Sequence, residues 1–418
     1  MKDGKKIRRK RMRNLLVAQS GGPTAAINAT VAGVLTAASL SGEVDQVLGA
    51  VNGIKGVLEE RFVNLSDVMN NTADLDLLCQ TPAAALGSCR FKLSDPQENP
   101  EQYEEIIRIF EKHEISYFIY IGGNDSMDTV DKLSAYCREK NIGDICIVGA
   151  PKTIDNDLMG TDHCPGFGSA AKYIGSTFAE LERDCSVYDT KAVTIVEVMG
   201  RNAGWLTASS ALARNNGGKG PSLIYLCERP FSIPQFLKDV REKLAVQDSV
   251  LVAVSEGIRD ARGVYISESV QSGAVDNFGH SYIAGSARVL EDAVRQEIGC
   301  KVRSVELNLM QRCAAHISSA TDIQESRLLG MTACHCALEG KSGRMASIQR
   351  VSDDPYRVKF TSVLVSEVSN REKKVPENFI SPAGNDVTES MMEYLEPLIQ
   401  GESPVLFENG IPRHIRLY

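Results

Sequence analysis

Short apolar runs rich in β-branched residues recur along the chain, and each ends in a turn of glycine or polar residues. The first run, 15–19, leads into Ser20-Gly21-Gly22-Pro23 and a stretch of helical periodicity to about residue 39. The second run, 117–121, leads into the turn 122–126 and a helical stretch to about residue 139. This alternation is typical of βα units around a parallel sheet. It predicts an α/β fold, with Pro23 in the first turn of a helix.

The same pattern continues through the middle of the chain. Further strand-and-turn units are expected at 145–157, 192–201, 250–257 and 302–312. In each unit the polar residues follow the carboxyl end of a strand, where open α/β sheets bind ligands beside helix N-termini. Two successive groups of such units predict two similar α/β domains. The more polar stretch 347–382, with a charged cluster at 370–374, is expected to be a surface excursion before a C-terminal helix.

Charge is distributed unevenly along the chain. The 418 residues include 46 basic and 54 acidic side chains, a net charge of −8. Eight basic residues and one acidic residue fall within residues 1–13, so the rest carries 38 basic and 53 acidic side chains, a net charge of −15. Such an acidic body argues against a general nucleic-acid or membrane binder, although a local basic pocket could hold a small phosphorylated ligand. Residues 1–13 are expected to form a disordered tail that catalysis does not need; a nucleic-acid arm or a transit peptide are the alternatives.

Apolar runs and cysteines narrow the class of protein further. No run approaches the roughly 20 residues of a membrane-spanning helix, and no signal-peptide apolar segment follows the basic start. Eleven cysteines without CxxC pairs predict reduced thiols in a cytoplasmic protein. His335 lies between Cys334 and Cys336, but without a second pair of ligands this is a poor zinc site, and a helix within a core is the preferred interpretation.

Two glycine-containing turns are candidate phosphate sites. Gly21-Gly22 would let backbone N–H groups approach a phosphate, and the following helix would add a favourable field; a simple tight connection is the alternative. The turn Gly122-Gly123-Asn124-Asp125-Ser126 adds an acidic residue that could hold a metal ion. Its polar residues would also suit the capping of a helix.

Two carboxylates lie two residues apart in the loop Thr153-Ile154-Asp155-Asn156-Asp157. One could act as a base toward a substrate hydroxyl while the other orients the hydroxyl or organises Mg²⁺. Taken alone, an Asx turn explains the pattern equally well. The two glycine turns ahead of this loop favour phosphoryl transfer.

The order of these segments resembles the phosphofructokinase family, from about residue 14 to the 340s. The segments that carry the resemblance are Ser20-Gly21-Gly22, Gly87-Ser88-Cys89-Arg90, 122–126, 151–157 (PKTIDND), 196–201 (VEVMGR) and Gln311-Arg312. The resemblance implies a phosphofructokinase-like fold of two Rossmann-like, three-layer α/β domains, each discontinuous in sequence. A larger donor-binding domain is expected at 14–165 plus about 311–365. A smaller domain that binds fructose 6-phosphate is expected at 166–310 plus about 366–418.

The resemblance also implies roles for single residues at the sugar site. Asp155 is expected to be the general base for the 1-hydroxyl, with Asp157 as its supporting carboxylate and Thr153 as a positioning hydroxyl. Arg201 is suited to stabilise charge on the transferring phosphoryl group. The other sugar-phosphate contacts are expected to be Met199, Gly200, Glu256, Arg312 and, from a neighbouring subunit, Arg303. A site completed by Arg303 implies a homo-oligomer, either a dimer or a tetramer.

On the donor side the resemblance distinguishes two branches of the family. The expected donor-binding residues are Gly21, Gly22, Arg90, Gly123, Asn124, Asp125 and Ser126. The ATP-dependent branch has glycine where this chain has Asp125 and Lys152. A carboxylate about 4 Å from an α-phosphate would add roughly 4 kcal/mol of repulsion at an effective dielectric constant of 20. Lys152, in contrast, could neutralise the end of a pyrophosphate and assist catalysis, which is similar to the pyrophosphate-dependent branch.

Some positions depart from the family pattern. Asn124 replaces an aspartate that is frequent in the pyrophosphate-dependent branch, so Mg²⁺ is expected to depend on Asp125. Leu309 stands where a histidine is frequent, and Ala192, beside Lys191, stands where a second phosphate-binding arginine would be.

The sequence therefore favours Mg²⁺-dependent, reversible phosphoryl transfer from pyrophosphate to fructose 6-phosphate, giving fructose 1,6-bisphosphate and phosphate. A cytoplasmic homo-oligomer without nucleic-acid or membrane partners is expected. The alternatives are an ATP-dependent 6-phosphofructokinase, a kinase for another sugar phosphate such as sedoheptulose 7-phosphate, and an inactive regulatory paralogue.

Overall fold

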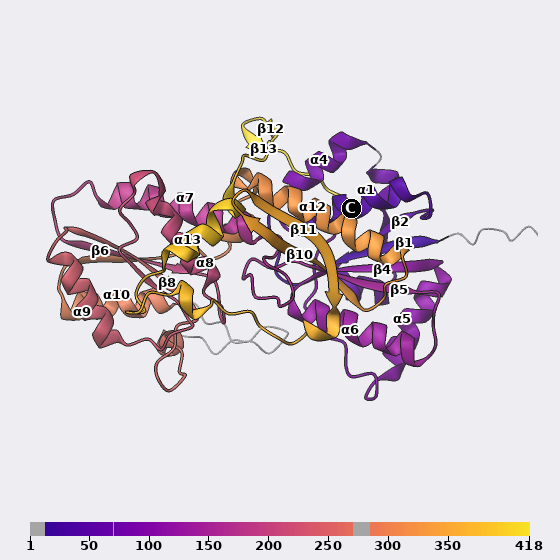
Figure 1. Ribbon diagram of the computed structural model, residues 1–418, viewed down its shortest axis with the longest axis horizontal. Coiled ribbons are helices and arrows are strands. Elements are labelled where there is room, and N and C mark those ends of the chain that lie inside the picture. Colours follow the sequence, from indigo (N-terminus) through magenta and orange to yellow (C-terminus); the bar gives the residue numbers. More distant parts are fainter. Residues whose placement is uncertain (1–12, 70, 271–284) are drawn as a thin grey trace, which may run out of the picture.

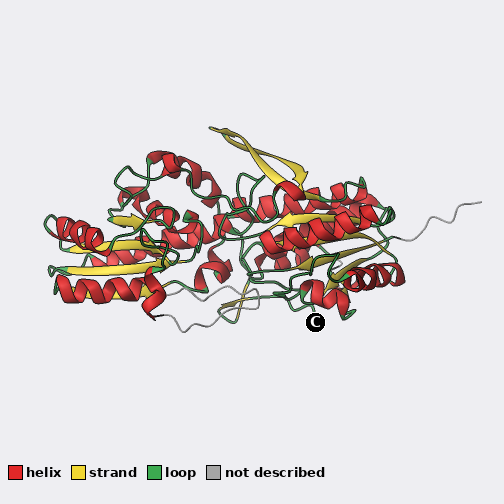
Figure 2. Cartoon of the chain, turned by 90° about the horizontal axis from the view of Figure 1, so that it is seen from below, coloured by secondary structure: helices red, strands yellow, loops and turns green. Residues whose placement is uncertain are grey.

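Two largely parallel β-sheets, each covered by helices on both faces, organise the chain (Figures 1 and 2). The computed structural model describes residues 13–69, 71–270 and 285–418. A seven-stranded sheet has the order β11-β10-β5-β4-β1-β2-β3, with antiparallel pairing of the two edge strands β3 and β11. A four-stranded sheet has the order β7-β8-β6-β9 and is parallel throughout. The α/β architecture of two similar units is thus confirmed.

Around the seven-stranded sheet lies what we call the larger unit. Its strands are β1 (Asn14–Gln19), β2 (Val47–Ala50), β3 (Phe62–Asn64), β4 (Ile115–Gly122), β5 (Cys146–Pro151), β10 (Arg344–Asp353) and β11 (Tyr356–Leu364). Its helices are α1 (Ile27–Ser41), α2 (Gly53–Leu58), α3 (Leu65–Val68), α4 (Thr72–Gln80), α5 (Pro100–Lys112), α6 (Asn124–Glu139) and α12 (Ala320–Leu338).

Successive side chains of a buried strand point to opposite faces of this sheet, and a different group of helices covers each face. Leu15 and Val17 of β1 point toward α1, α4 and α12, whereas Leu16 and Ala18 point toward α2, α5 and α6. Strand residues are buried on both faces, as a parallel sheet between two helical layers requires. The turns that follow β1, β4 and β5 therefore emerge together at one edge of the sheet.

The smaller unit is built around the four-stranded sheet. Its strands are β6 (Ala192–Val198), β7 (Leu223–Tyr225), β8 (Ser249–Ser255) and β9 (Lys301–Glu306). Its helices are α7 (Phe167–Cys185), α8 (Trp205–Ala208), α9 (Ile233–Leu244), α10 (Ser286–Glu297), α11 (Met310–Cys313) and α13 (Glu389–Leu395). One face of the sheet packs on α7, α8 and α13, and the other packs on α9 and α10.

The chain crosses between the two units more than once, and its C-terminal end returns to the larger one (Figure 1). After α13, the short hairpin of β12 (Phe407–Glu408) and β13 (Ile411–Pro412) is held by Gln80 at the end of α4. The Gln80 amide donates to the carbonyls of Leu406 and Arg413, at 3.2 and 2.6 Å. Residues around this hairpin therefore belong structurally with the larger unit.

Several local expectations need correction. Helix α1 begins at Ile27, so Pro23 lies before the helix, in a loop where the Thr24 hydroxyl accepts the N–H of Ile27 at 3.0 Å. The stretch 347–382 is not a mere surface excursion, because it begins within β10 and contains β11, which extend the main sheet. Residues Ser347 and Ile348 of β10 are buried there, whereas the residues of β10 from Gln349 onward are partly or fully exposed.

At the N-terminus, the proposed tail 1–13 lies outside the described residues except for Arg13. That residue is tied to the body, since its backbone N–H donates to Asp45 at 2.7 Å and its guanidinium donates to Tyr117 at 3.1 Å. The helix expected around His335 is confirmed as part of α12, with Cys334 and Cys336 buried and His335 exposed. Within the described residues, no helix is long and apolar enough to cross a membrane.

Candidate active site

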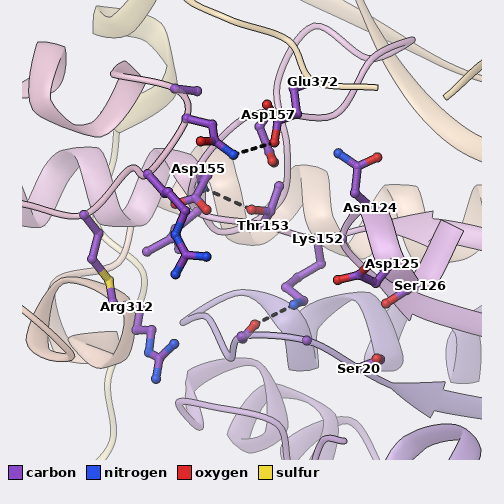
Figure 3. A pocket seen from close by; sticks show the side chains of 18 of the residues that line it. Ser20, Asn124, Asp125, Ser126, Lys152, Thr153, Asp155, Asp157, Arg312 and Glu372 are labelled. Atoms are coloured by element: carbon purple, nitrogen blue, oxygen red, sulfur yellow. Dashed lines mark hydrogen bonds between the residues drawn. The ribbon is translucent and has the colours of Figure 1, made fainter. Parts of the chain in front are cut away.

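A cavity of about 650 Å³ opens between the two units, at the carboxyl ends of β1, β4, β5, β6 and β8 (Figure 3). This size is ordinary for small-molecule sites. Most residues expected at the site line it, namely Gly21, Gly22, Arg90, Gly123, Asn124, Asp125, Ser126, Lys152, Thr153, Asp155, Asp157, Met199, Arg201, Glu256 and Arg312. Gly200 and Arg303 are the two expected residues that are not part of the lining.

The turn after β1 is shaped by glycine and by a buried lysine. Gly21 has φ of +74°, and a Cβ there would lie 3.3 Å from Nζ of Lys152. Nζ of Lys152 in turn donates to the carbonyl of Gly22. The Ser88 hydroxyl donates to the carbonyl of Gly21 at 2.6 Å, which fixes the turn from the other side. Backbone and ammonium groups are therefore already arranged around a space without intervening side chains.

Lys152 is almost fully buried, with 1% of its surface exposed. Burial, and then the neighbouring charge of Arg312, lower the pKa of Lys152 to about 7. Among the described residues no carboxylate forms an ion pair with it at short range. A bound anion at this position would restore the charged form of the lysine.

The loop after β5 is anchored by the residue that lies between its two carboxylates. Asn156 is buried with φ of +55°, donates to the Tyr394 hydroxyl at 2.9 Å and accepts the N–H of Cys164 at 3.0 Å. Because Asn156 points into the protein, Asp155 and Asp157 are left on the pocket side. The N–H of Asp155 donates to the Thr153 hydroxyl at 3.1 Å, so Thr153 supports the loop.

Both carboxylates have raised pKa values. Burial, and then the neighbouring Glu256, raise the pKa of Asp155 to about 6. Burial, and then Asp155 itself, raise the pKa of Asp157 to about 7. Perturbed acids in a cleft are characteristic of catalytic sites, and a base with a pKa near the working pH is well matched to proton transfer.

The smaller unit supplies an arginine on a strained turn after β6. Gly200 has φ of +129° and its N–H donates to Glu256 at 3.2 Å, so it shapes the turn rather than lining the cavity. A Cβ on Gly257 would lie 1.9 Å from the carbonyl oxygen of Arg201, which shows how closely the two turns pack. Nε of Arg201 is buried and has no hydrogen-bond partner among the described residues. This donor is available to an anionic ligand.

Arg312 and Glu256 complete the lining of the cavity on the side of the smaller unit. Nη1 of Arg312 would lie 3.3 Å from a Cβ on Gly22, so this side chain reaches from α11 toward the first glycine turn. Burial, and then Arg90, lower the pKa of Arg312, which indicates a concentration of positive charge at this end. Burial raises the pKa of Glu256 to about 7, although the N–H of Gly200 opposes the shift.

The turn after β4 starts α6 directly, with Gly123 as N-cap and no side-chain cap. The alternative considered from the sequence, capping of the helix by Asn124, Asp125 or Ser126, is therefore not observed, and all three residues line the cavity. Asn124 donates to the carbonyl of Arg371 at 2.9 Å, while its Oδ1 is buried without a partner among the described residues. Asp125 lines the cavity beside it.

A magnesium ion fits this donor set. The described residues contain no group of three or more His, Cys, Asp or Glu side chains that could hold a metal ion. Mg²⁺ is commonly bound through one or two carboxylates together with substrate phosphates. The Asp125 carboxylate and the unsatisfied Asn124 oxygen are ligands of this kind.

Arg303 does not line this cavity; it is exposed on β9, which is an edge strand of the smaller sheet. Sequence reasoning also missed lining residues from other segments. The missed residues include Lys92, Asn202, Asn370 and Glu372. Asn370 and Glu372 belong to the charged cluster 370–374. The sequence shows the composition of this cluster, but it does not show that the cluster lies at the site.

Comparisons with known proteins agree with this geometry. A protein-family model described as Phosphofructokinase matches residues 14–337. A Pyrophosphate--fructose 6-phosphate 1-phosphotransferase of Xanthomonas campestris pv. campestris (strain B100) is 41% identical over 407 residues, which cover 97% of this chain and 96% of the relative. The ATP-dependent 6-phosphofructokinase 2 of Streptomyces coelicolor is 29% identical over 334 residues, covering 80% of this chain and 90% of the relative.

Among solved structures, a pyrophosphate-dependent phosphofructokinase from Nitrosospira multiformis superposes with a TM-score of 0.86 at 36% identity. The match covers 97% of this chain and 96% of that chain.

Proposed function

The chain belongs to the phosphofructokinase family, and from this premise we propose that it transfers a phosphoryl group from pyrophosphate to the 1-hydroxyl of fructose 6-phosphate. The products are fructose 1,6-bisphosphate and phosphate, a reversible step of glycolysis. The observation that carries the choice of donor is the placement of Asp125 and Lys152 in the same cavity. Similar full-length relatives that are named for pyrophosphate support it.

Asp155 is the general base. With a pKa near 6 it is ionised at neutral pH, yet it is basic enough to accept a proton from the sugar hydroxyl. The hydroxyl oxygen then attacks the terminal phosphorus of pyrophosphate, the bridging P–O bond breaks, and its electron pair leaves with the second phosphate. Asp157 holds the loop geometry, and Thr153 supports the N–H of Asp155.

Positive groups stabilise the transferring phosphoryl group from two sides. Lys152 lies on the donor side, where its buried ammonium donates to the carbonyl of Gly22 and gains a negatively charged partner at short range when an anion binds. Arg201 lies on the sugar side with an unpaired Nε. Preorganised donors of this kind stabilise developing charge at little reorganisation cost. Asp125 leaves no favourable place for the α-phosphate of a nucleotide.

Glu256 and Met199 bound the sugar pocket, and Arg312 binds the 6-phosphate with Arg303 from a neighbouring subunit. Asp125, with the Asn124 oxygen, would hold Mg²⁺, which would neutralise charge on the donor. Gly21, Gly22, Arg90, Gly123 and Ser126 surround the donor phosphates.

We propose that each of the two units binds one of the two substrates. We assign the donor to the larger unit, 14–165 plus about 320–365, and the sugar to the smaller unit, 166–317 plus about 366–400. The boundary lies after α11 because the N–H of Met199 donates to the Gln311 side chain, which ties α11 to the smaller unit. Residues 406–415 hydrogen-bond to Gln80 and Thr81, so we place the C-terminal hairpin with the larger unit instead of the smaller one. A homo-oligomer in the cytoplasm is consistent with an exposed Arg303 and with eleven unpaired cysteines.

A donor assay tests this proposal. Purified protein is given fructose 6-phosphate and Mg²⁺ with either pyrophosphate or ATP, and product is measured in both directions. We expect turnover with pyrophosphate in both directions and a kcat/KM for ATP at least about tenfold lower, the effect of about 1.4 kcal/mol. Comparable rates with ATP would favour the ATP-dependent alternative, and no turnover with either donor would favour an inactive paralogue.

A further inference from the structure

The charged cluster of the C-terminal region lies across the mouth of the donor site. We call residues Ser369 to Lys373 the strap. Asn370 and Glu372 of the strap line the cavity together with Asp125 and Lys152, although more than 200 residues separate them in sequence. In Figure 3, Glu372 lies beside Asp157 and on the same side of the cavity as Asn124, away from Arg312.

The strap is attached to the first turns of α6. Asn124 donates to the carbonyl of Arg371 at 2.9 Å, and Asn370 donates to Oδ1 of Asp128 at 2.9 Å. The Ser369 hydroxyl donates to Asp131 at 3.2 Å. These three acceptor or donor positions follow one another along α6, which begins at the donor turn. The strap therefore covers the helix face that leads away from the donor phosphates.

Further hydrogen bonds connect the strap, through α6, with the segment on the other side of the cavity that carries Arg90. Oδ2 of Asp128 accepts from Lys132 at 2.7 Å, and Lys132 also donates to the carbonyl of Leu93 at 3.2 Å. Leu93 follows Arg90 and Lys92, which line the cavity. Asp128 is thus held between Lys132 and Asn370, and the rim is continuous from the strap to the segment that carries Arg90.

The other end of the strap is anchored to the catalytic loop and to the smaller unit. Glu372 accepts from Asn202 at 2.7 Å, and the backbone N–H of Lys373 donates to the carbonyl of Asp157 at 2.7 Å. The buried Lys373 ammonium donates to the carbonyl of Asp162 at 2.6 Å and lies 5.3 Å from the centre of the Trp205 ring. A segment fixed at both ends cannot easily swing away.

We propose that the strap limits the length of the phosphoryl donor, by closing the far wall of the donor site against α6 so that two phosphates fit and a longer donor does not. This inference rests on the proposed function and specifies it. A third phosphate or a nucleoside would have to displace the strap from Asn124 and Asp128. It would also bring negative charge toward Asp131 and Glu372, which raises the electrostatic cost.

The strap explains why Asn124 is useful at a position where the resemblance leads one to expect an aspartate. A carboxylate has no N–H to donate to the carbonyl of Arg371, whereas the amide does. Asn124 thereby connects the donor turn directly with the strap.

The test compares donors of different length. Asn370 has φ of +59°, so Asn370→Gly removes the bond to Asp128 without straining the backbone. Lys374→Ala is the matched control, because Lys374 is the exposed residue directly after the strap. Wild type and both variants are assayed with pyrophosphate, tripolyphosphate and ATP at saturating fructose 6-phosphate. Melting temperature and the KM for fructose 6-phosphate are measured in parallel.

We expect Asn370→Gly to raise the ratio of kcat/KM for tripolyphosphate over pyrophosphate about tenfold, corresponding to about 1.4 kcal/mol, and Lys374→Ala to leave it unchanged. A general loss of structure would lower both rates without changing this ratio. If Asn370→Gly does not fold, Ser369→Ala removes the neighbouring bond and should move the ratio in the same direction.

Two results would overturn the inference while the proposed function stands. One is a wild-type enzyme that uses tripolyphosphate as well as pyrophosphate. The other is an unchanged donor ratio in folded Asn370→Gly and Ser369→Ala. A wild-type protein inactive with pyrophosphate would instead overturn the proposed function, and the inference with it.

Discussion

At the scale of single residues, burial places the groups of the site near their working range of pH. Asp155 has a pKa near 6 and Lys152 near 7, because both lose hydration in the same cavity. Burial disfavours the charged form of each, so the acid shifts upward and the base shifts downward. The two shifts bring the pKa values of Asp155 and Lys152 close together. The charge of the bound substrate then decides whether each side chain is protonated.

Replacing the base should separate chemistry from binding. We expect Asp155→Ser to lower kcat by about 10² to 10⁴, the usual contribution of a general base. The KM for fructose 6-phosphate should change little, because Arg201, Glu256 and Arg312 remain. Steady-state kinetics in both directions check this, and near-normal turnover in either direction would remove Asp155 from the role of base.

The pH profile of kcat/KM for pyrophosphate should be narrow. Below pH 6 to 7 the carboxyl groups of Asp155, Asp157 and Glu256 become protonated, so activity falls as pH decreases. Above pH 7 the free enzyme loses the proton of Lys152, so activity falls as pH increases. We therefore expect an optimum near pH 7.

Bound pyrophosphate favours the charged lysine, so the basic limb of kcat should lie at higher pH than that of kcat/KM. In Lys152→Met this limb should disappear from the weaker activity that remains, which distinguishes the lysine from the titration of pyrophosphate itself. A basic limb of kcat/KM that is identical in the variant would show that Lys152 is not responsible for it.

At the scale of elements, the donor turn depends on how closely α1 packs on α12. A Cβ on Gly330 of α12 would lie 2.0 Å from the carbonyl oxygen of Thr30, and one on Gly33 would lie 1.9 Å from that of Arg327. Neither contact is possible without separating the helices. Since α1 follows the Gly21-Gly22 turn, its position also sets the position of the donor site.

Gly330→Ala should therefore destabilise the protein, although alanine favours helix by about 1 kcal/mol. We expect the free energy of unfolding to fall by about 1–3 kcal/mol, as overpacking of a core typically costs. Gly143→Ala is the control, because a Cβ there has open space around it. Denaturant unfolding of both variants gives the comparison, and equal stability would mean that the two helices separate at no cost.

At the scale of the whole molecule, an acidic body surrounds a locally positive site. The net charge of −15 beyond residue 13 does not describe the cavity, where Lys152, Arg201 and Arg312 lie near Arg90. Local charge governs the binding of small anions, whereas net charge governs long-range attraction of polyanions. Of the positive side chains expected at the site, Arg303 is the one that does not line the cavity of its own chain.

Mixing of two variant subunits tests whether Arg303 acts across an interface. We expect Arg303→Ala to raise the KM for fructose 6-phosphate at least about tenfold, the loss of a charged hydrogen bond to phosphate of 1.5–3 kcal/mol. When Arg303→Ala and Asp155→Ser chains are mixed and allowed to exchange, hybrid sites with Asp155 from one chain and Arg303 from the other should regain low KM. If the KM for fructose 6-phosphate stays high in the mixture although the subunits do exchange, a shared site is excluded.

The sequence by itself determined six of the strands, the turns after them and the chemistry at their ends. The strand Ala192–Val198 begins the unit that was predicted at 192–201, and the turns after β1, β4, β5, β6 and β8 all reach one cavity. These features were accessible because they are local: apolar periodicity marks a strand, and the residues directly after it occupy the carboxyl edge of the sheet.

Only the tertiary structure decided which distant segments of the chain contact those turns. Asn370 bonds to Asp128 from 242 positions away, and Asn156 turns inward because Tyr394 is there to receive it. The stretch 347–382 looked like surface because the second half of β10 and the whole of β11, at the edge of the sheet, contain only partly buried and exposed residues. Contacts between distant segments produce no periodic pattern in the sequence. The position of the strap and the inward direction of the Asn156 side chain are therefore visible only in the folded structure.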